Sequence, residues 1–125
     1  MNENELSAVL VNIFLKVHKE LGPGLLESVY EEIVSFELAE AGFEFTRQQA
    51  IPVIYQNKKL EIGFRADIIV ENKVIIEIKS IDTIAPVHQK QLLTYLKLTD
   101  IKLGLLVNFN VNLIKDGICR VVNNL

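Results

Sequence analysis

The sequence predicts a mixed α/β domain, because its hydrophobic periodicity changes along the chain. Over the first third, apolar residues recur at spacings of three and four, which is typical of amphipathic helices. After Gly42 the chain changes to short runs of β-branched and aromatic residues, which are typical of strands. Near the end, a strand leads through a helix to another strand, which implies a parallel pair with a right-handed crossover. The expected fold is a mixed central β-sheet flanked by helices, in the order α-α-β-β-β-α-β-β.

Two helices are expected before Gly42. The first spans Glu3 to Leu21, where apolar residues repeat with helical spacing at Leu6, Val9, Leu10, Ile13, Phe14 and Val17. Gly22-Pro23-Gly24 then interrupts the chain. The same period resumes from about residue 25 to 41, and Gly42 supplies a C-terminal stop.

Strands are expected in the middle of the chain. Pro52 suits an edge strand, and Gln56-Asn57 is a turn signal. Between Glu61 and Val70 the residues alternate, so that one face of a half-buried strand carries Ile62, Phe64, Ala66, Ile68 and Val70. The run from Lys73 to Lys79 alternates in the same way. With Glu71-Asn72 as the turn, these two runs predict a β-hairpin.

The last third predicts one helix and two strands. Pro86 suits the first turn of a helix over about 86 to 99, whose buried side would carry Leu92, Leu93 and Leu96. The apolar run from Leu103 to Phe109 predicts a buried strand. A turn around Asp116-Gly117 then leads to a final strand through Val121-Val122. We find no repeats and no linker, so all 125 residues are expected to form one domain.

Composition excludes several classes of protein. Half of the residues are hydrophobic and 23% are charged, which excludes disordered, collagen-like and low-complexity chains. The uncharged run near the N-terminus, Leu6 to Leu15, is far shorter than the ~20 residues of a membrane span. The chain begins with acidic residues rather than a basic signal segment, and Cys119 is its single cysteine. These features predict a cytoplasmic protein that does not act at a membrane.

The net charge of −3 argues against a nucleic-acid partner when it is taken alone. It conceals an asymmetry, however, because residues 1 to 44 carry −7 and residues 45 to 125 carry +4. The acidic part is most simply a solvated helix face. The basic part leaves open a surface that faces phosphates.

Four charged side chains, Arg65, Asp67, Glu77 and Lys79, interrupt the hydrophobic runs of the expected hairpin. Such residues are costly in a sheet unless they are solvated or used. If Val70 pairs with Val74, a three-residue loop places Asp67 opposite Glu77 and Arg65 opposite Lys79. A two-residue loop would put the two carboxylates on opposite faces. We therefore predict a three-residue loop or a bulge.

Two facing carboxylates repel each other by about 4 kcal/mol at about 4 Å and an effective dielectric near 20, so a positive group is expected between them. Lys79 and Arg65 would satisfy this as a structural ion-pair network. A divalent metal would satisfy it better and leave Lys79 free for substrate. A site with only oxygen ligands favours Mg²⁺ or Mn²⁺ over zinc.

The helices add further candidates. His88, Gln91 and Tyr95 share one face of the third helix, either as part of a site or as a rim that makes ordinary hydrogen bonds. Glu27 and Tyr30 lie three residues apart at the start of the second helix. Glu27 would serve as a ligand or would simply be favourable to the helix dipole.

Several motifs together carry a resemblance to a known family. Gly24-Leu25-Leu26-Glu27-Ser28-Val29-Tyr30 resembles the motif of the GxxExxY protein family. Three further segments resemble signatures of the PD-(D/E)XK nuclease superfamily: Arg65-Ala66-Asp67, Glu77-Ile78-Lys79 and Gln91-Leu92-Leu93-Thr94-Tyr95. The order of the four motifs, over about residues 21 to 122, is typical of that superfamily. One departure is Ala66, which stands where the superfamily name has proline.

The resemblance implies a restriction-endonuclease-like core and a metal-dependent nuclease. It makes Asp67 and Glu77 the metal ligands, with the Ile78 carbonyl as a backbone ligand and Glu27 as an acid on the helix. Lys79 would orient the attacking water and offset charge in the transition state. Gln91 and Tyr95 would support the site, and the auxiliary candidates are Tyr30, Arg65 and His88.

Function is therefore expected to be Mg²⁺-dependent or Mn²⁺-dependent hydrolysis of phosphodiesters, with DNA favoured over RNA as the substrate. The alternative is a nuclease-fold module, weakly active or inactive, that binds nucleic acid or a protein partner. A small chain has little surface for specificity, so a homodimer that spans two phosphates is compatible with this expectation.

Overall fold

The computed structural model describes the backbone of all 125 residues and the side chains of all except Glu61 and Ile62. Its elements follow the order expected from the sequence, with one added 3₁₀ turn. The helices and strands are α1 (Glu3–Leu21), α2 (Glu27–Glu40), β1 (Phe45–Tyr55), β2 (Lys58–Val70), β3 (Val74–Lys79), α3 (Pro86–Thr99), β4 (Leu103–Asn108), η1 (Ile114–Gly117) and β5 (Ile118–Val122).

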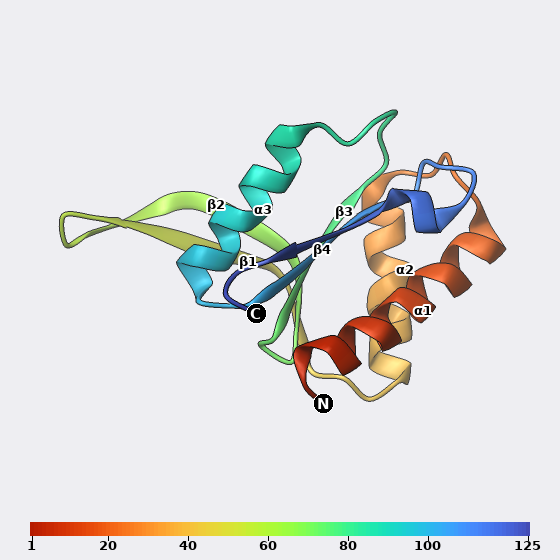
Figure 1. Ribbon diagram of the computed structural model, residues 1–125, viewed down its shortest axis with the longest axis horizontal. Coiled ribbons are helices and arrows are strands. Elements are labelled where there is room, and N and C mark those ends of the chain that lie inside the picture. The colour runs from red at the N-terminus through yellow and green to blue at the C-terminus, as the bar shows by residue number, and fades with distance from the viewer.

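The described strands form a single mixed sheet in the order β1-β2-β3-β4-β5 (Figure 1). Strands β3 and β4 are parallel, and the other neighbours are antiparallel. The parallel pair is connected through α3, as the strand-helix-strand pattern predicts. The mixed sheet and its flanking helices are confirmed.

Each face of the sheet is covered by different helices. Helices α1 and α2 pack on one face around Phe14, Tyr30, Ile68 and Ile76. Helix α3 packs on the other face, where Leu92, Tyr95 and Leu96 are among the residues of a second, smaller core. The strands between the two cores are therefore covered on both sides along much of their length.

Local sequence explains where the first two helices begin and end. Asn2 and Glu5 form a reciprocal capping box at the start of α1, with hydrogen bonds of 2.8 and 2.9 Å. Gly22 ends α1 with a φ of 67°, which glycine adopts at little cost. The hydroxyl of Tyr30 donates to the Gly22 carbonyl and accepts from the Leu25 amide, so it holds the turn between the helices.

The alternation expected for residues 61 to 70 is only partly correct. Ile68 and Val70 pack under α1 and α2, but Phe64 and Ala66 belong to the core under α3. Ile69 is also buried, so the end of β2 is covered on both faces rather than half-buried. The strand therefore changes its facing near Asp67. The expected positions of Glu61 and Ile62 lie outside the described side chains.

The hairpin between β2 and β3 has the expected register. Val70 pairs with Val74, and residues 71 to 73 form the three-residue loop. The first hairpin, β1–β2, turns at Gln56-Asn57, where φ is 48° and 65°. Two positive φ values are those of a type I′ turn, which matches the twist of the two strands. Figure 1 shows this hairpin extending well beyond the helices.

Among the described residues, no helix combines the length and the apolarity that crossing a bilayer requires.

Candidate active site

The carboxylates of Asp67 and Glu77 lie where strands β2 and β3 separate. The ladder between these strands runs from Val70↔Val74 to Ile68↔Ile76 and ends there. At the next position the backbone amide of Asp67 donates to Glu77 Oε1 at 3.1 Å. The amide of Ile78 donates to Asp67 Oδ2 at 2.8 Å. Each acid therefore accepts a hydrogen bond from the opposite strand, and the two side chains form a fork between the strands.

Burial and mutual repulsion dominate the electrostatics of this fork. Glu77 is only 7% exposed, and burial, followed by the negative charge of Asp67, raises its pKa to about 8. Burial also raises the pKa of Asp67, against the hydrogen bond from Ile78 that lowers it. Without another cation, the pair thus favours a shared proton near neutral pH.

Lys79 and Tyr95 lie close to the fork. The positive charge of Lys79 lowers the pKa of both carboxyl groups, although burial outweighs it. Tyr95 projects from α3 and packs against Phe64, with ring centroids 5.1 Å apart. Burial, followed by the charges of Glu77 and Asp67, raises the pKa of Tyr95 to about 12. Four of the expected residues, Asp67, Glu77, Lys79 and Tyr95, therefore lie together where β2 and β3 separate.

Glu27 lies at the other end of this region, beside the residue that follows Lys79. Its Oε2 accepts a hydrogen bond from the Ser80 amide at 3.0 Å, and the Ser80 hydroxyl donates to the Leu25 carbonyl at 2.6 Å. The exposed Glu27 side chain lines a hollow of about 560 Å³ together with Ser80 and Asn110. The start of α2 is therefore fixed to the end of β3.

Glu31 is a neighbour of Asp67 that the sequence reasoning missed. It is 8% exposed, and its negative charge raises the pKa of Asp67. Its Oε2 accepts two hydrogen bonds from Arg47, at 3.0 and 2.8 Å. Glu31 lies four residues after Glu27, on the same face of α2. That spacing was the signal that could have found it.

Gln48 connects Glu31 to Asp67. Its Nε2 donates to Glu31 Oε1 at 2.6 Å and to Asp67 Oδ1 at 3.2 Å. Arg47 pairs with Ile68 and Gln49 pairs with Ala66, so Gln48 lies opposite Asp67. Its φ of 51° is in the left-handed region, which is uncommon for residues other than glycine and is held only by surrounding contacts. No sequence pattern indicated this residue.

The other expected residues have different surroundings. Arg65 was expected opposite Lys79, and this was wrong, because the two residues are not paired across β2 and β3; Arg65 instead donates to the Gln48 carbonyl on β1. The reason is that the β2–β3 ladder ends at Ile68.

Three remaining candidates lie on the helices. The Nδ1 atom of His88 accepts from the Ala85 amide at 2.9 Å and so caps the start of α3. Gln91 is partly buried one helical turn before Tyr95. Tyr30 is fully buried and stacks on Phe109, with centroids 4.4 Å apart, so its ring belongs to the core.

The oxygen donors of the fork fit a hard divalent cation. Mg²⁺ is commonly held by one or two carboxylates and completes its shell with water and substrate phosphates. Asp67 and Glu77 supply two carboxylates, and a bound cation would relieve the repulsion between their negative charges. Among the described side chains, no group of three acidic, histidine or cysteine residues converges to form a fully protein-lined site. The donors therefore suit Mg²⁺ or Mn²⁺ better than zinc.

Comparison with known proteins identifies the family. A search of curated proteins and of solved structures finds no significant match. The model of the PD-(D/E)XK nuclease superfamily matches residues 4–121, which include every helix and strand of the site described above. The fork in the sheet, with Lys79 beside it, agrees with that match. The chain therefore belongs to the PD-(D/E)XK nuclease superfamily.

Proposed function

We propose that this protein is a nuclease that hydrolyses phosphodiester bonds of DNA and depends on Mg²⁺ or Mn²⁺. The observation that carries the proposal is the pairing of Asp67 with Glu77 at the end of the β2–β3 ladder, beside Lys79. Membership of the nuclease superfamily supports the reaction class. The segment from Gly24 to Tyr30 supports placing the chain with the GxxExxY proteins.

Each residue has a role in this proposal. Asp67 and Glu77 would hold the cation, which when bound polarises the scissile phosphate. The Lys79 ammonium orients the attacking water and offsets the negative charge that grows on the phosphate oxygens as the P–O bond to the leaving group breaks. Tyr95 closes the α3 side of the fork, with Gln91 beside it. Glu27 keeps the segment after Lys79 in place through the Ser80 amide.

The experiment is a cleavage assay with end-labelled duplex, single-stranded and branched DNA and with RNA of matched sequence. We expect cleavage of DNA with Mg²⁺ or Mn²⁺ and none with EDTA. The matched control is Asp67→Asn, which keeps the side-chain size and one oxygen. Cleavage that survives in Asp67→Asn, or no cleavage of any substrate by the wild type, would contradict the proposal.

A second candidate is a nuclease-fold module without catalysis. The observation that favours it is that three of the four carboxylate oxygens of Asp67 and Glu77 already accept hydrogen bonds. Such a module would bind nucleic acid or a protein without needing a cation. Calorimetric titration with Mg²⁺ separates the two: binding near physiological concentration supports the nuclease, and no heat at millimolar cation supports the module.

Gln48 offers a test of how the fork is positioned. Gln48→Ala removes the amide that joins Glu31 to Asp67, so the Asp67 carboxylate loses a hydrogen bond that fixes its orientation. We expect Mg²⁺ affinity to fall roughly tenfold, within the range typical for loss of a residue that orients a metal ligand. Calorimetry measures the affinity, and Gln49→Ala is the control at the adjacent exposed position. Equal affinities in the two variants would show that Gln48 does not position Asp67.

A further inference from the structure

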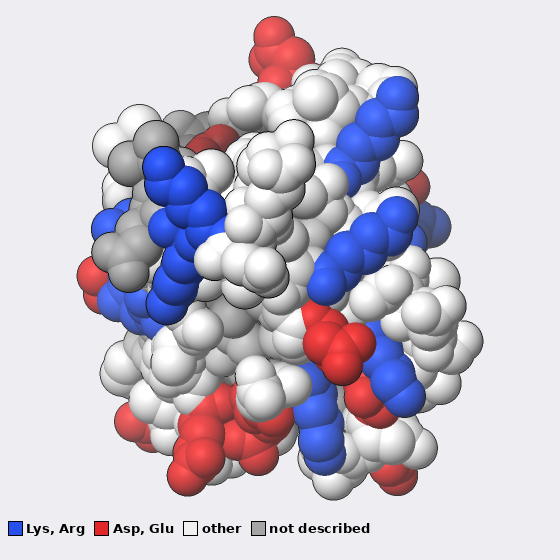
Figure 2. Space-filling view, turned by 90° about the vertical axis from the view of Figure 1, so that its left-hand side faces the viewer, with Lys and Arg blue, Asp and Glu red and all other residues white. Residues whose placement is uncertain are grey.

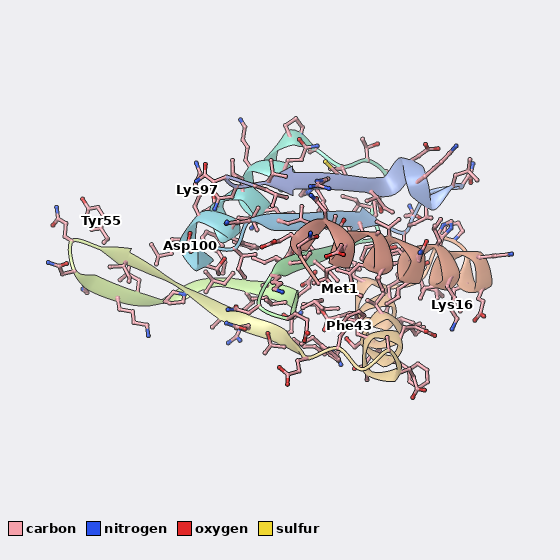
Figure 3. The ribbon with its side chains drawn as sticks, turned by 60° about the horizontal axis from the view of Figure 1, so that its bottom comes forward. Met1, Lys16, Phe43, Tyr55, Lys97 and Asp100 are labelled. Carbon is pink, nitrogen blue, oxygen red and sulfur yellow. The ribbon has the colours of Figure 1, made fainter. Side chains whose placement is uncertain are left out.

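The far end of the β1–β2 hairpin, residues 53–60, forms an arm that the rest of the protein leaves uncovered. Figure 1 shows the hairpin reaching past α3, and Figure 3 shows Tyr55 near its tip. Ile54 is 67% exposed and Tyr55 is 66% exposed. The tight turn at Gln56-Asn57 keeps the arm to the width of two strands.

Basic side chains follow this arm back towards the body of the protein. Lys58, Lys59 and Arg65 are all exposed. Lys59 and Arg65 line a hollow of about 330 Å³ whose other walls are Ala50 and Pro52. Figure 2 looks at this end of the molecule and shows Lys and Arg side chains on both sides of it, with a cluster of acidic side chains at the lower left and others at the top and right. Within the described side chains, these three cations form no salt bridge.

The arm is connected to the candidate active site by direct contacts. Arg65 donates from Nη1 to the Gln48 carbonyl at 3.0 Å. The Gln48 amide in turn donates to Asp67 Oδ1. A polymer of phosphates that follows Lys59 and Arg65 would therefore arrive beside Asp67.

We infer that the arm is a DNA-binding element that enters the major groove of duplex DNA while Lys58, Lys59 and Arg65 contact phosphates. This inference rests on the proposed function, because the path of cations from Lys59 through Arg65 leads to Asp67, the proposed metal ligand. The major groove of B-form DNA is about 12 Å wide and admits a two-stranded β-ribbon. The major groove of A-form RNA is deep and too narrow for side chains to enter. The shape of the arm therefore favours duplex DNA over duplex RNA.

The length of the arm suits this role. Three residues in each strand, at about 3.3 Å per residue, reach roughly 10 Å, which is enough to cross the major groove's depth of about 8.5 Å. The exposed side chains of Ile54 and Tyr55 would then meet base edges, where apolar contacts with thymine methyl groups are available. In the pairs Tyr55↔Lys58 and Ile54↔Lys59 each lysine shares a face with its partner, so each face of the arm carries one apolar side chain and one cation.

Fluorescence anisotropy with a labelled DNA duplex of about three helical turns tests the inference. All proteins carry Asp67→Asn and the buffer contains EDTA, so that no cleavage occurs. In Lys58→Ala/Lys59→Ala, we expect the slope of log K against log salt to fall by about 1.8, since each lost phosphate contact contributes about 0.9. Extrapolated from about 1 M salt, this is a roughly 60-fold loss of affinity near 0.1 M.

The matched control is Lys19→Ala/Lys115→Ala, which removes two exposed lysines near the end of α1 and η1. We expect it to leave the slope within about 0.5 of the parent value. Equal slopes for the arm variant and its parent would overturn the inference. A matched RNA duplex should bind at least tenfold more weakly than the DNA, and equal binding would overturn entry into the groove. Light scattering on the arm variant gives a further check, because dissociation of a dimer with unchanged DNA binding would make the arm a contact between copies instead.

This test separates the arm from the proposed activity. If the wild type binds DNA through the arm but cleaves no substrate with Mg²⁺ or Mn²⁺, the proposed nuclease function is wrong and the DNA-binding role of the arm is supported. If the wild type cleaves DNA and the arm variant binds DNA with unchanged salt dependence, the DNA-binding role of the arm is wrong and the proposed nuclease function is supported.

Discussion

In EDTA, the free energy of unfolding of the wild-type protein is expected to fall as the pH rises from about 5 to about 8, and Glu77→Gln is expected to remove most of that fall. Glu77 has its pKa raised from 4.5 to about 8 in the folded protein. Over this window the folded state binds a proton that the unfolded state has released, so raising the pH favours unfolding. The contribution is complete below about 4.5 and is lost as the pH passes the folded pKa.

The expected size of this effect is large. A shift of this extent corresponds to about 5 kcal/mol as an upper limit, and Asp67, whose pKa is also raised, acts in the same direction. Urea unfolding at several pH values measures it. The control is Glu40→Gln, at an exposed position near the end of α2, which should unfold with the same pH dependence as the wild type. If the free energy of unfolding depends on pH in the same way for the wild type and Glu77→Gln, the pKa of Glu77 is not raised in the folded protein.

Lys79→Ala is expected to reduce the rate of DNA cleavage by about 100-fold to 1000-fold, in line with the loss of one positioned group that stabilises transition-state charge. The substitution removes the cation whose charge reaches both carboxyl groups of the fork. Single-turnover cleavage with excess protein measures the chemical step rather than substrate binding.

Two variants make the Lys79 result specific. Lys90→Ala removes an exposed lysine on α3 and should cleave at the wild-type rate. Lys79→Arg keeps a positive charge and should recover part of the lost rate. A rate for Lys79→Ala within a factor of about three of wild type would exclude Lys79 from the chemical step.

Local patterns predicted the pairing of strands more reliably than the facing of side chains. The three-residue loop at 71 to 73 was expected because only an odd loop places Asp67 and Glu77 on one face, and the register has this form. The strict alternation through β2 failed, because Phe64 and Ala66 pack under α3 whereas Ile68 packs under α1 and α2. The change of facing depends on where the β2–β3 ladder ends. The sequence does not reveal this point, because the residues that pack under α3 and those that pack under α1 and α2 are all apolar.

In the candidate site, too, the sequence indicated some residues and missed others. Asp67 and Glu77 stood out because charge in a hydrophobic strand is costly without a purpose, so composition alone indicated them. Gln48 did not stand out, because its role arises from a left-handed backbone and from two acids that belong to different elements. Contacts of this kind depend on tertiary structure, which a pattern along one strand does not contain.

The fork at the end of the β2–β3 ladder makes both acids part of the architecture of the sheet. Each carboxylate accepts a backbone hydrogen from the opposite strand, so replacing it with an apolar side chain leaves a buried amide without a partner. A relative without catalytic activity would therefore still need oxygen acceptors at the positions of Asp67 and Glu77 to keep these two amides paired. Retention of this acidic pair in other chains would therefore report an intact fold first, and under the proposed function the loss of the neighbouring lysine would be the clearer sign of lost activity.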